Sequence, residues 1–504
     1  MSSIFLCTFS ATVAGKQIYV PSALGNVNDN TNQWCYERSI QSDNFIVFWE
    51  AGYGSNPNGV QVGGYTANVQ SILALAETCF DFYADSLKFI TRGNSKTDLY
   101  KIIIRLYHTA DWIASGSGMD DKIGVLNLST WAASALGVTV AHEVGHCFQY
   151  QVHCDGWQGG WMYGLGNNGA GGNCFWEMCA QWQAFKVFPT QQFTDGRFNN
   201  YLKTAHKHIL HETPRYDNFF IQDYWSYLHG MDFIGRLWQQ SHSPEDPVEA
   251  YQRITGITQE EFNDEIYDCA TRFVTWDIPA LRANGASRIL SRAQTKMNAD
   301  TAGYWRIDAS NCPENYGYNV IRLNLTQGTT TIVAAFEGIL GNASNGFRAK
   351  NPSKNGWRFG FVHQAADGTR TYSPMHSAHT SSPDIVPRDT ITFACPAGGR
   401  LWFVVTGAPT QHWHHEWDDN DTNDEQWGYR VKFLNTNLVG ETNITTAVSD
   451  IIYPNSNEVT VRNLMGQVRY KGNADNFDWQ NKLPVGIYLV TTNGKTTKIM
   501  IQNK

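Results

Sequence analysis

Hydrophobic residues recur at three- and four-residue steps in four stretches of the first half of the chain. This spacing places them on one face of a helix and predicts amphipathic helices. The four stretches are residues 69–90, 138–153, 175–188 and 223–240. Two shorter apolar runs, 99–109 and 123–130, predict strands. Eight glycines between residues 156 and 172 predict a loop between the second and third helices.

After about residue 300 the pattern changes to alternating strands separated by turn residues, which is typical of a β-sandwich. The clearest strands lie at residues 318–325, 329–336, 399–407 and 429–435. A linker rich in Thr, Asn and Ser follows, and the last fifty or so residues predict a small β-domain. Within it, Asn493–Gly494 separates two alternating runs and predicts a hairpin, because both residues tolerate positive φ.

These patterns predict a multidomain α+β fold in four parts. We expect a leader at residues 1–19, a mixed domain at 20–295, an all-β sandwich at 296–438 and a small β C-terminal domain at 439–504.

Charge and hydropathy narrow the class of protein. Only 17% of residues are charged and the net charge is −8, with no basic cluster, so we expect no nucleic-acid partner. No apolar run approaches the length of about eighteen residues that a transmembrane segment needs. Residues 4–13 are mostly apolar and are followed by Ala14 and Gly15, which resembles the end of a signal peptide. We therefore expect a secreted or cell-surface protein.

Ten cysteines are present, without CxxC or zinc-finger spacing. Cys154 and Cys174 flank the glycine-rich loop, so they could close it as a disulfide. Scattered buried thiols explain the cysteines equally well.

The helix at residues 138–153 carries His142–Glu143–Val144–Gly145–His146. Residues four apart on a helix point the same way, so the two imidazoles can bind one ion. Glu143 lies one step round the helix, where it reaches a water molecule beside the ion and can act as a general base. Gly145 costs about 1 kcal/mol relative to alanine, which indicates close approach of another backbone. The alternative is a buried helix that happens to carry two histidines.

A zinc site needs a third protein ligand. Glu177 is the best candidate, because Ala180, Gln181 and Ala184 on its helix face are small or polar and permit close packing against another helix. The alternative role for Glu177 is a carboxylate near a helix N-terminus. His153 and Asp155 remain further candidates for the third ligand.

This arrangement resembles the gluzincins, zinc metallopeptidases with an HExxH motif and a Glu as third ligand. The resemblance implies a zincin-like domain at residues 20–295 that binds one catalytic Zn²⁺ through His142, His146 and Glu177. It also implies that residues 123–130 form the edge strand along which a substrate peptide lies. The chain departs from the thermolysin type in two respects: the gap between His146 and Glu177 is longer, and Gln181 replaces an Asp.

Similarity to the same enzymes suggests that a Tyr or His from a later helix stabilises the transition state. Residues 223–230 offer Tyr224, Tyr227 and His229, of which Tyr224 is our choice. Gln149 and His153 lie on the same face as His142 and could orient the metal ligands.

The C-terminal part resembles the sorting domain of proteins exported by type IX secretion. The matching segments are Asn463–Gln467, Leu483–Tyr488 and the turn at Asn493–Lys495. The resemblance implies that the outer-membrane secretion machinery is a partner.

Residues 412–427 form a second polar cluster. His412, His414 and His415 could bind a metal, and Asp419, Asp421 and Asn423 imitate part of a structural Ca²⁺ loop, although the EF-hand pattern breaks after them. A solvated loop is the alternative. Trp413 and Trp417, if exposed, could stack on sugar rings.

Together these features predict a secreted zinc metallopeptidase that hydrolyses peptide bonds of extracellular proteins or glycoproteins. The competing hypothesis is a zincin-shaped protein that binds carbohydrates or glycoproteins without turnover.

Overall fold

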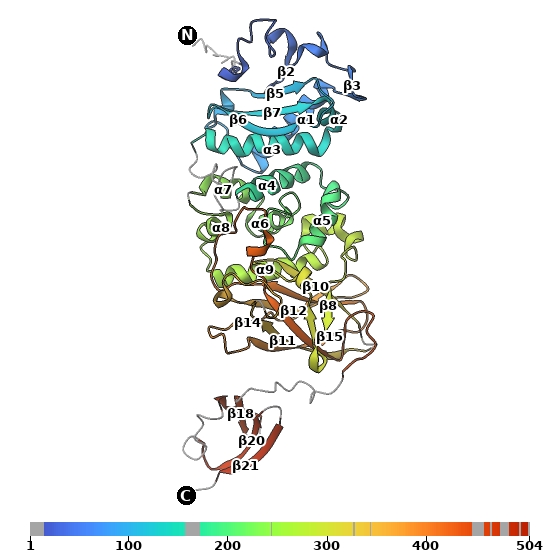
Figure 1. Cartoon of the computed structure of the whole chain (residues 1–504), viewed down its shortest axis with the longest axis vertical. Coiled ribbons are helices and arrows are strands. Elements are labelled where there is room, and N and C mark those ends of the chain that lie inside the picture. Colours follow the sequence, from blue (N-terminus) through green and yellow to red (C-terminus); the bar gives the residue numbers. More distant parts are fainter. Residues whose placement is uncertain are drawn as a thin grey trace, which may run out of the picture.

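The computed structural model describes residues 15–156, 172–242, 244–325, 328–342, 344–445, 458–463, 466–473, 483–492 and 495–501. Helices and several separate sheets combine in this structure, which confirms the mixed α+β class (Figure 1). Most of the expected leader lies outside the described residues. Among the described residues, no helix is both long and apolar enough to span a bilayer.

The first sheet has five strands in the order β1-β2-β5-β7-β6. Its strands are β1 (Ser39–Gln41), β2 (Phe45–Trp49), β5 (Ile102–Tyr107), β6 (Ala114–Met119) and β7 (Ile123–Ser129). The three central strands are parallel, and β1 and β6 are antiparallel at the two edges. Every residue of β2 is buried, as expected for a parallel strand covered on both faces. A separate two-stranded hairpin joins β3 (Gln61–Val62) and β4 (Tyr65–Thr66).

The expectation that residues 123–130 form the edge strand is wrong, because β7 lies between β5 and β6. The edge strand is β6, whose sequence Ala-Ser-Gly-Ser-Gly-Met contains no β-branched residue. It is held in place by a tight turn at Asp120 and Asp121, both at positive φ, that pairs it with β7.

Three helices accompany this sheet: α1 (Val69–Asp81), α2 (Thr130–Ala135) and α3 (Gly137–Cys154). α3 packs against β6 and β7, α1 packs against β2, and α1 and α3 contact each other. The helix expected at 69–90 continues past α1 as one π-helical segment, Phe82–Ser86.

The next layer consists of helices only (Figure 1). They are α4 (Gly172–Val187), α5 (Gly196–Thr204), α6 (Phe220–His229), α7 (Phe233–Gln240), α8 (Pro247–Thr255), α9 (Gln259–Val274) and α10 (Pro279–Gly285). The single stretch expected at 223–240 is two helices, because Gly230 adopts a φ of 100° that ends α6.

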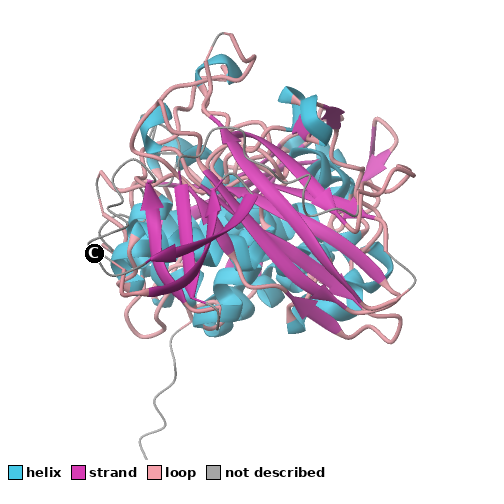
Figure 2. Cartoon of the chain, turned by 90° about the horizontal axis from the view of Figure 1, so that it is seen from below, coloured by secondary structure: helices cyan, strands magenta, loops and turns pink. Residues whose placement is uncertain are grey.

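Two five-stranded sheets face each other in the second half of the chain. One contains β10 (Tyr318–Leu323), β12 (Trp357–Gln364), β13 (Arg370–Tyr372), β14 (His376–Ala378) and β16 (Arg400–Gly407). The other contains β8 (Met297–Ala299), β9 (Trp305–Ile307), β11 (Thr330–Ile339), β15 (Arg388–Cys395) and β17 (Gly428–Leu434). Seen from below, these strands lie in front of the helices (Figure 2).

Alternation along β16 explains how the sandwich joins the helical layer. Phe403 and Val405 lie in the core between the two sheets, whereas Trp402 and Val404 belong to the core of the first half. Since β16 and β12 contact α9, the sheet is buried on both faces.

The C-terminal sheet is fully antiparallel, in the order β19-β18-β20-β21. Its strands are β18 (Glu458–Asn463), β19 (Val468–Asn473), β20 (Gly486–Thr492) and β21 (Lys495–Ile501). The expected turn at Asn493–Gly494 lies outside the described residues, between two strands that do pair.

The nine cysteines that the structure describes are all free and buried. A disulfide between Cys154 and Cys174 is therefore wrong, and the alternative of buried thiols holds for both residues.

Candidate metal centre

α3 carries three buried polar side chains at its centre. His142 and Glu143 are each 7% exposed and His146 is 4% exposed. The two imidazole rings lie 4.6 Å apart, centroid to centroid, and cross at 88°. Because α3 packs directly against β6, these side chains lie beneath the edge of the first sheet.

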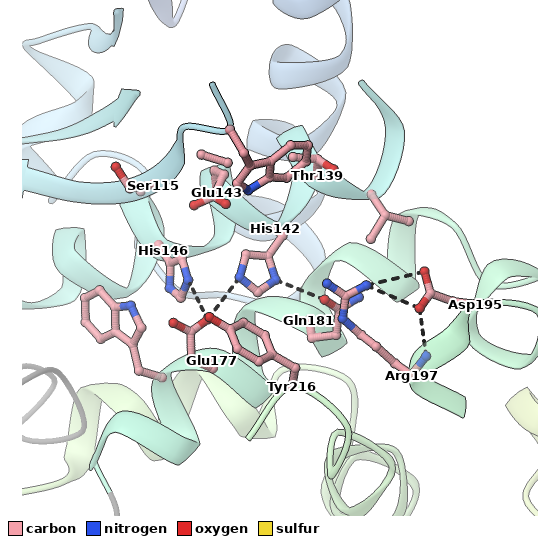
Figure 3. Close-up of a pocket in the computed structure, with 15 residues that line it drawn as sticks. Ser115, Thr139, His142, Glu143, His146, Glu177, Gln181, Asp195, Arg197 and Tyr216 are labelled. Carbon is pink, nitrogen blue, oxygen red and sulfur yellow. Dashed lines mark hydrogen bonds and ion pairs between the residues drawn. The ribbon is translucent and has the colours of Figure 1, made fainter. Parts of the chain in front are cut away.

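Glu177 on α4 completes the cluster. Its Oε2 lies 3.2 Å from Nε2 of His142 and 3.2 Å from Nε2 of His146 (Figure 3). Ligand atoms at 2.0–2.1 Å from a tetrahedral zinc ion lie about 3.3 Å from one another, so Oε2 of Glu177 lies at this spacing from each of the two histidine nitrogens. Burial alone would raise the pKa of Glu177, but hydrogen bonds from the two imidazoles hold it well below its usual value.

α3 and α4 approach closely at this point. A Cβ on Gly145 would lie 3.2 Å from the Cα of Ala180 and 3.0 Å from Oε1 of Gln183. The glycine in the HExxH motif therefore faces the neighbouring helix, which lets Glu177 reach both histidines.

Two buried amides orient the imidazoles. Oε1 of Gln181 lies 3.2 Å from Nδ1 of His142, and Oε1 of Gln149 lies 2.9 Å from Nδ1 of His146. An amide oxygen accepts only, so each Nδ1 carries a proton. With an ion bound, each Nε2 would give up its hydrogen bond to Glu177 and offer its lone pair to the ion. The amide of Gln149 is itself fixed, since it donates to the carbonyl of Trp176.

Glu143 faces the other side of the cluster. Burial raises its pKa, which the charges of His142 and His146 and a hydrogen bond from the backbone of Gly116 offset only in part. A buried carboxylate held by one backbone N–H on the edge strand is positioned to take a proton from a water molecule.

A pocket of about 380 Å³ opens onto this cluster. Its walls come from β6, α3, α4 and the segments on either side of α5. The lining residues include Trp112, Ser115, Gly116, Thr139, Trp176, Asp195, Arg197 and Tyr216, together with His142, Glu143, His146, Glu177 and Gln181.

Tyr216 is the pocket residue that sequence reasoning missed. Its ring centroid lies 6.0 Å from that of His142, and its hydroxyl hydrogen-bonds Glu177. Burial and the charge of Glu177 raise its pKa to about 12, so the hydroxyl keeps its proton. It lies in an irregular segment between α5 and α6, where neither helical nor strand periodicity draws attention to it.

Comparison with known proteins places the chain in a family. A model described as a family of unknown function, DUF6055, matches residues 10–440. The chain belongs to this family. No curated protein matches its sequence.

Three solved structures show weak likenesses, all at a TM-score of 0.15. The first is CorA, a surface-associated copper-binding protein of Methylomicrobium album BG8, with 8% identity over 27% of this chain and 90% of that one. The second is the family GH115 4-O-methyl-alpha-glucuronidase BtGH115A, with 10% identity over 61% and 44%. The third is the Bacillus licheniformis lipase BlEst2 in its propeptide form, with 9% identity over 87% and 84%. Likenesses at this level do not indicate the function of this member of the DUF6055 family.

The structure corrects the choice of Tyr224 as the transition-state donor. Tyr224 is 1% exposed and its hydroxyl donates to Oδ2 of Asp268 on α9, at 2.8 Å. It does not line the pocket. The register of α6 turns Tyr224 toward α9, while the preceding segment brings Tyr216 to the metal cluster.

The alternative third ligands are engaged elsewhere. Oδ1 of Asp155, at the end of α3, accepts from the backbone N–H of Lys96 and from the amide of Gln151. Nε2 of His153 lies 3.1 Å from Oδ1 of Asp121. Neither residue lines the pocket, whereas Gln149 does hydrogen-bond His146.

Two of the histidines expected to bind a metal in the cluster at 412–427, His414 and His415, lie in groups of residues that could hold an ion. His412 pairs with Asp246 at 2.8 Å and His414 with Glu249 at 2.7 Å. Oδ2 of Asp421, expected in a calcium loop, pairs with Lys207.

Trp413 and Trp417 are half-buried rather than exposed. The amino group of Lys354 lies over the ring of Trp413, and the guanidinium of Arg215 lies over that of Trp417. Stacking on sugar rings requires exposed tryptophans, so these two residues do not support sugar binding by the sandwich.

Proposed function

We propose that this protein is a secreted or cell-surface zinc metallopeptidase with a gluzincin-like catalytic site. The observation that carries the proposal is that Glu177 Oε2 lies at zinc-ligand spacing from both His142 Nε2 and His146 Nε2 inside a pocket. His142, Glu143 and His146 also form a buried group that could hold a metal ion. The donor set of two imidazoles and one carboxylate leaves a fourth position open, which is typical of catalytic rather than structural zinc.

Zinc bound there would polarise a water molecule and the scissile carbonyl. Glu143 then accepts a proton from the attacking water and passes it to the leaving amine. Its burial and raised pKa suit this exchange, because a more basic carboxylate takes up the proton more readily. Gly116 holds the carboxylate in place through its backbone N–H.

Tyr216 supplies the hydrogen-bond donor for the developing oxyanion. Its hydroxyl stays protonated at neutral pH and lies beside Glu177. β6 has a strand partner on one side only, within the described residues, so its free edge can pair with an extended peptide. The substrate class that fits is therefore an extended segment of an extracellular protein or glycoprotein.

The test is digestion of a peptide library by zinc-loaded protein, with cut sites identified by mass spectrometry. Cleavage that stops when zinc is removed by a chelator and returns with added zinc supports the proposal. Binding of library peptides or glycans without any cleavage would favour the rival hypothesis of a zincin-shaped binding protein.

Glu177→Ala is expected to lose zinc from this site on dialysis, because two imidazoles alone bind it weakly. Elemental analysis beside wild type measures this as one zinc ion fewer per chain. Asp155→Asn is the matched control and should keep the wild-type content, since its carboxyl binds the backbone of Lys96 instead. Wild-type zinc content in Glu177→Ala together with a lower content in Asp155→Asn would move the third ligand to the end of α3.

Tyr216→Phe should lower kcat by about 10²-fold with little change in KM, because one donor to the transition state is removed. Tyr224→Phe is the control: its hydroxyl binds Asp268, outside the pocket, so turnover should stay close to wild type. Steady-state kinetics on one cleaved peptide decide the point. The reverse pattern would restore Tyr224 to the mechanism.

We also propose that the protein is exported, on the resemblance of its two ends to a signal peptide and a type IX sorting domain. The C-terminal sheet has its own small core, formed by Val459, Val461, Leu483, Tyr488 and Val490. A self-contained sheet at the end of the chain suits recognition by secretion machinery.

A further inference from the structure

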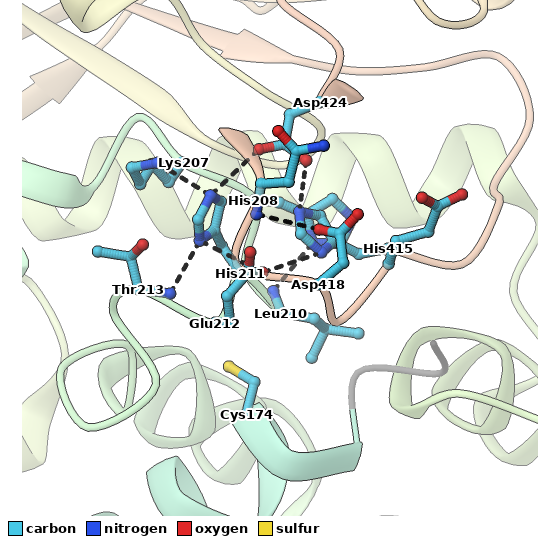
Figure 4. Close-up of polar contacts among 12 residues, drawn as sticks. Cys174, Lys207, His208, Leu210, His211, Glu212, Thr213, His415, Asp418 and Asp424 are labelled. Carbon is cyan, nitrogen blue, oxygen red and sulfur yellow. Dashed lines mark hydrogen bonds and ion pairs between the residues drawn. The ribbon is translucent and has the colours of Figure 1, made fainter. Parts of the chain in front are cut away.

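A second group of histidines and carboxylates lies where the helical layer meets the β-sandwich. His208, His211 and Glu212 come from the segment between α5 and α6. Glu314 precedes β10, and His415 and Asp424 come from the segment between β16 and β17. All six residues are buried, and none is more than 8% exposed. Figure 4 shows the side chains from the two segments converging.

The distances within this cluster are short. Nε2 of His415 lies 3.1 Å from Oδ1 of Asp424, and Nε2 of His211 lies 3.2 Å from Oδ2 of the same carboxylate. One ligand atom from each of His211, Glu314, His415 and Asp424 lies within 4.8 Å of the others. The group therefore has the dimensions of a metal site.

The charges of the cluster do not balance without a cation. Arg348 pairs with Glu314 at 2.7 Å, and Lys207 pairs with Asp421 at 2.9 Å. These pairs neutralise Glu314 and the adjacent Asp421, and they leave Glu212 and Asp424.

The histidines supply at most one compensating charge. Backbone N–H groups of Leu210 and Thr213 donate to Nδ1 of His208 and His211, each at 2.9 Å. An amide N–H can only donate, so both rings keep a lone pair on Nδ1 and are neutral. Of the three histidines, only His415 can supply a positive charge. One of the two negative charges on Glu212 and Asp424 therefore remains uncompensated.

Glu212 makes this imbalance costly. It is 2% exposed, and neither of its carboxyl oxygens has a hydrogen-bond partner within the part of the chain that the structure describes. Its Oε2 lies 3.5 Å from Nδ1 of His415 and 3.6 Å from Nδ1 of His211, beyond hydrogen-bonding distance. A buried carboxylate without partners is strongly unfavourable, so a positive charge is needed nearby.

We propose that His415, Asp424 and Glu314 bind a divalent cation at this junction, with Glu212 as the neighbouring balancing charge. A dication with neutral His415 offsets the charges of Glu212 and Asp424 completely. Imidazole mixed with carboxylates favours a transition-metal ion such as zinc over calcium, which prefers oxygen ligands alone.

Ion binding at this junction would also affect the position of a residue in the pocket. The attraction between the ion and the carboxylate of Glu212 would hold the segment after α5 against the sandwich, and that segment carries Tyr216 four residues after Glu212. The second site would therefore hold a pocket residue in place from the far side, without touching substrate.

The test is the zinc content of four dialysed proteins: wild type, Glu177→Ala, Asp424→Asn and the double variant. About two ions per chain are expected in wild type, about one in each single variant and almost none in the double variant. Asp419→Asn, an exposed neighbour in the same segment, is the matched control and should keep the wild-type content.

A folding defect in Asp424→Asn does not end the test. His415→Gln provides a second variant, and Glu177→Ala by itself provides a measurement that leaves the second site intact. After chelation, zinc should raise the Tm of Glu177→Ala by several degrees, because the ion binds the folded state only.

Folded Glu177→Ala that holds no zinc and shows no Tm response to it would overturn the second site. Because the first site is removed in that variant, this result leaves the proposed peptidase untouched. The second site is supported instead if Glu177→Ala keeps one zinc ion per chain and loses that ion only when Asp424 is also replaced.

Discussion

Glu143→Gln is expected to keep its zinc and to lose roughly 10³-fold in kcat, within the 10²–10⁴-fold range of general acid–base catalysis. Gln has the shape of Glu and can still accept the backbone N–H of Gly116. It cannot take a proton from water at neutral pH. The proposed ligands His142, His146 and Glu177 are unchanged in this variant, so zinc binding and catalysis are measured separately.

The measurement pairs elemental analysis with kinetics on a peptide that wild type cleaves. Glu37→Gln, an exposed carboxylate outside the pocket, serves as the control and should retain full turnover. Undiminished turnover in Glu143→Gln would end this mechanism. Loss of zinc together with activity would make Glu143 a ligand rather than a base.

The parts of the site that the sequence predicts are those set by local periodicity. His142 and His146 are four residues apart, so one helix suffices to bring their rings together. Glu177 was chosen because small residues on its helix face favour close packing, and Ala180 does lie against Gly145. The structure places all three side chains in one cluster.

The missed parts depend on contacts between segments far apart in the chain. Tyr216 belongs to an irregular segment and reaches the pocket only because α5 and α6 pack around it. The edge strand β6 is rich in Ser and Gly, so no alternation marks it, and the sequence favours the more apolar β7 as the edge. The cluster around Glu212 joins residues about two hundred positions apart, which no spacing rule relates.

The sandwich was easier to predict than the site around it. β10, β11, β16 and β17 all overlap alternating runs that the sequence marks, because one face of each strand is buried in the core between the sheets. Helix ends were harder. Gly230 ends α6 through a positive φ that apolar spacing alone does not reveal.

Gly116→Ala should destabilise the first half of the chain by about 3 kcal/mol, the upper range for overpacking. A Cβ at Gly116 would lie 2.0 Å from the carbonyl oxygen of Glu143 and 2.8 Å from Cβ of His146. The obstacle is helix backbone, which cannot rotate away, so β6 must move off α3. In a domain of this size we expect Tm to fall by roughly 6–12 °C.

The same movement would displace the backbone N–H that holds Glu143, so turnover should fall even in the fraction that remains folded. Thermal unfolding and kinetics well below Tm report the two effects separately. Gly196→Ala is the matched control: its Cβ would meet nothing within 4 Å, so neither stability nor turnover should suffer. Wild-type stability in Gly116→Ala would mean that β6 does not lie against the metal-binding helix as closely as the glycine requires, and the pairing of substrate along that edge would lose its basis.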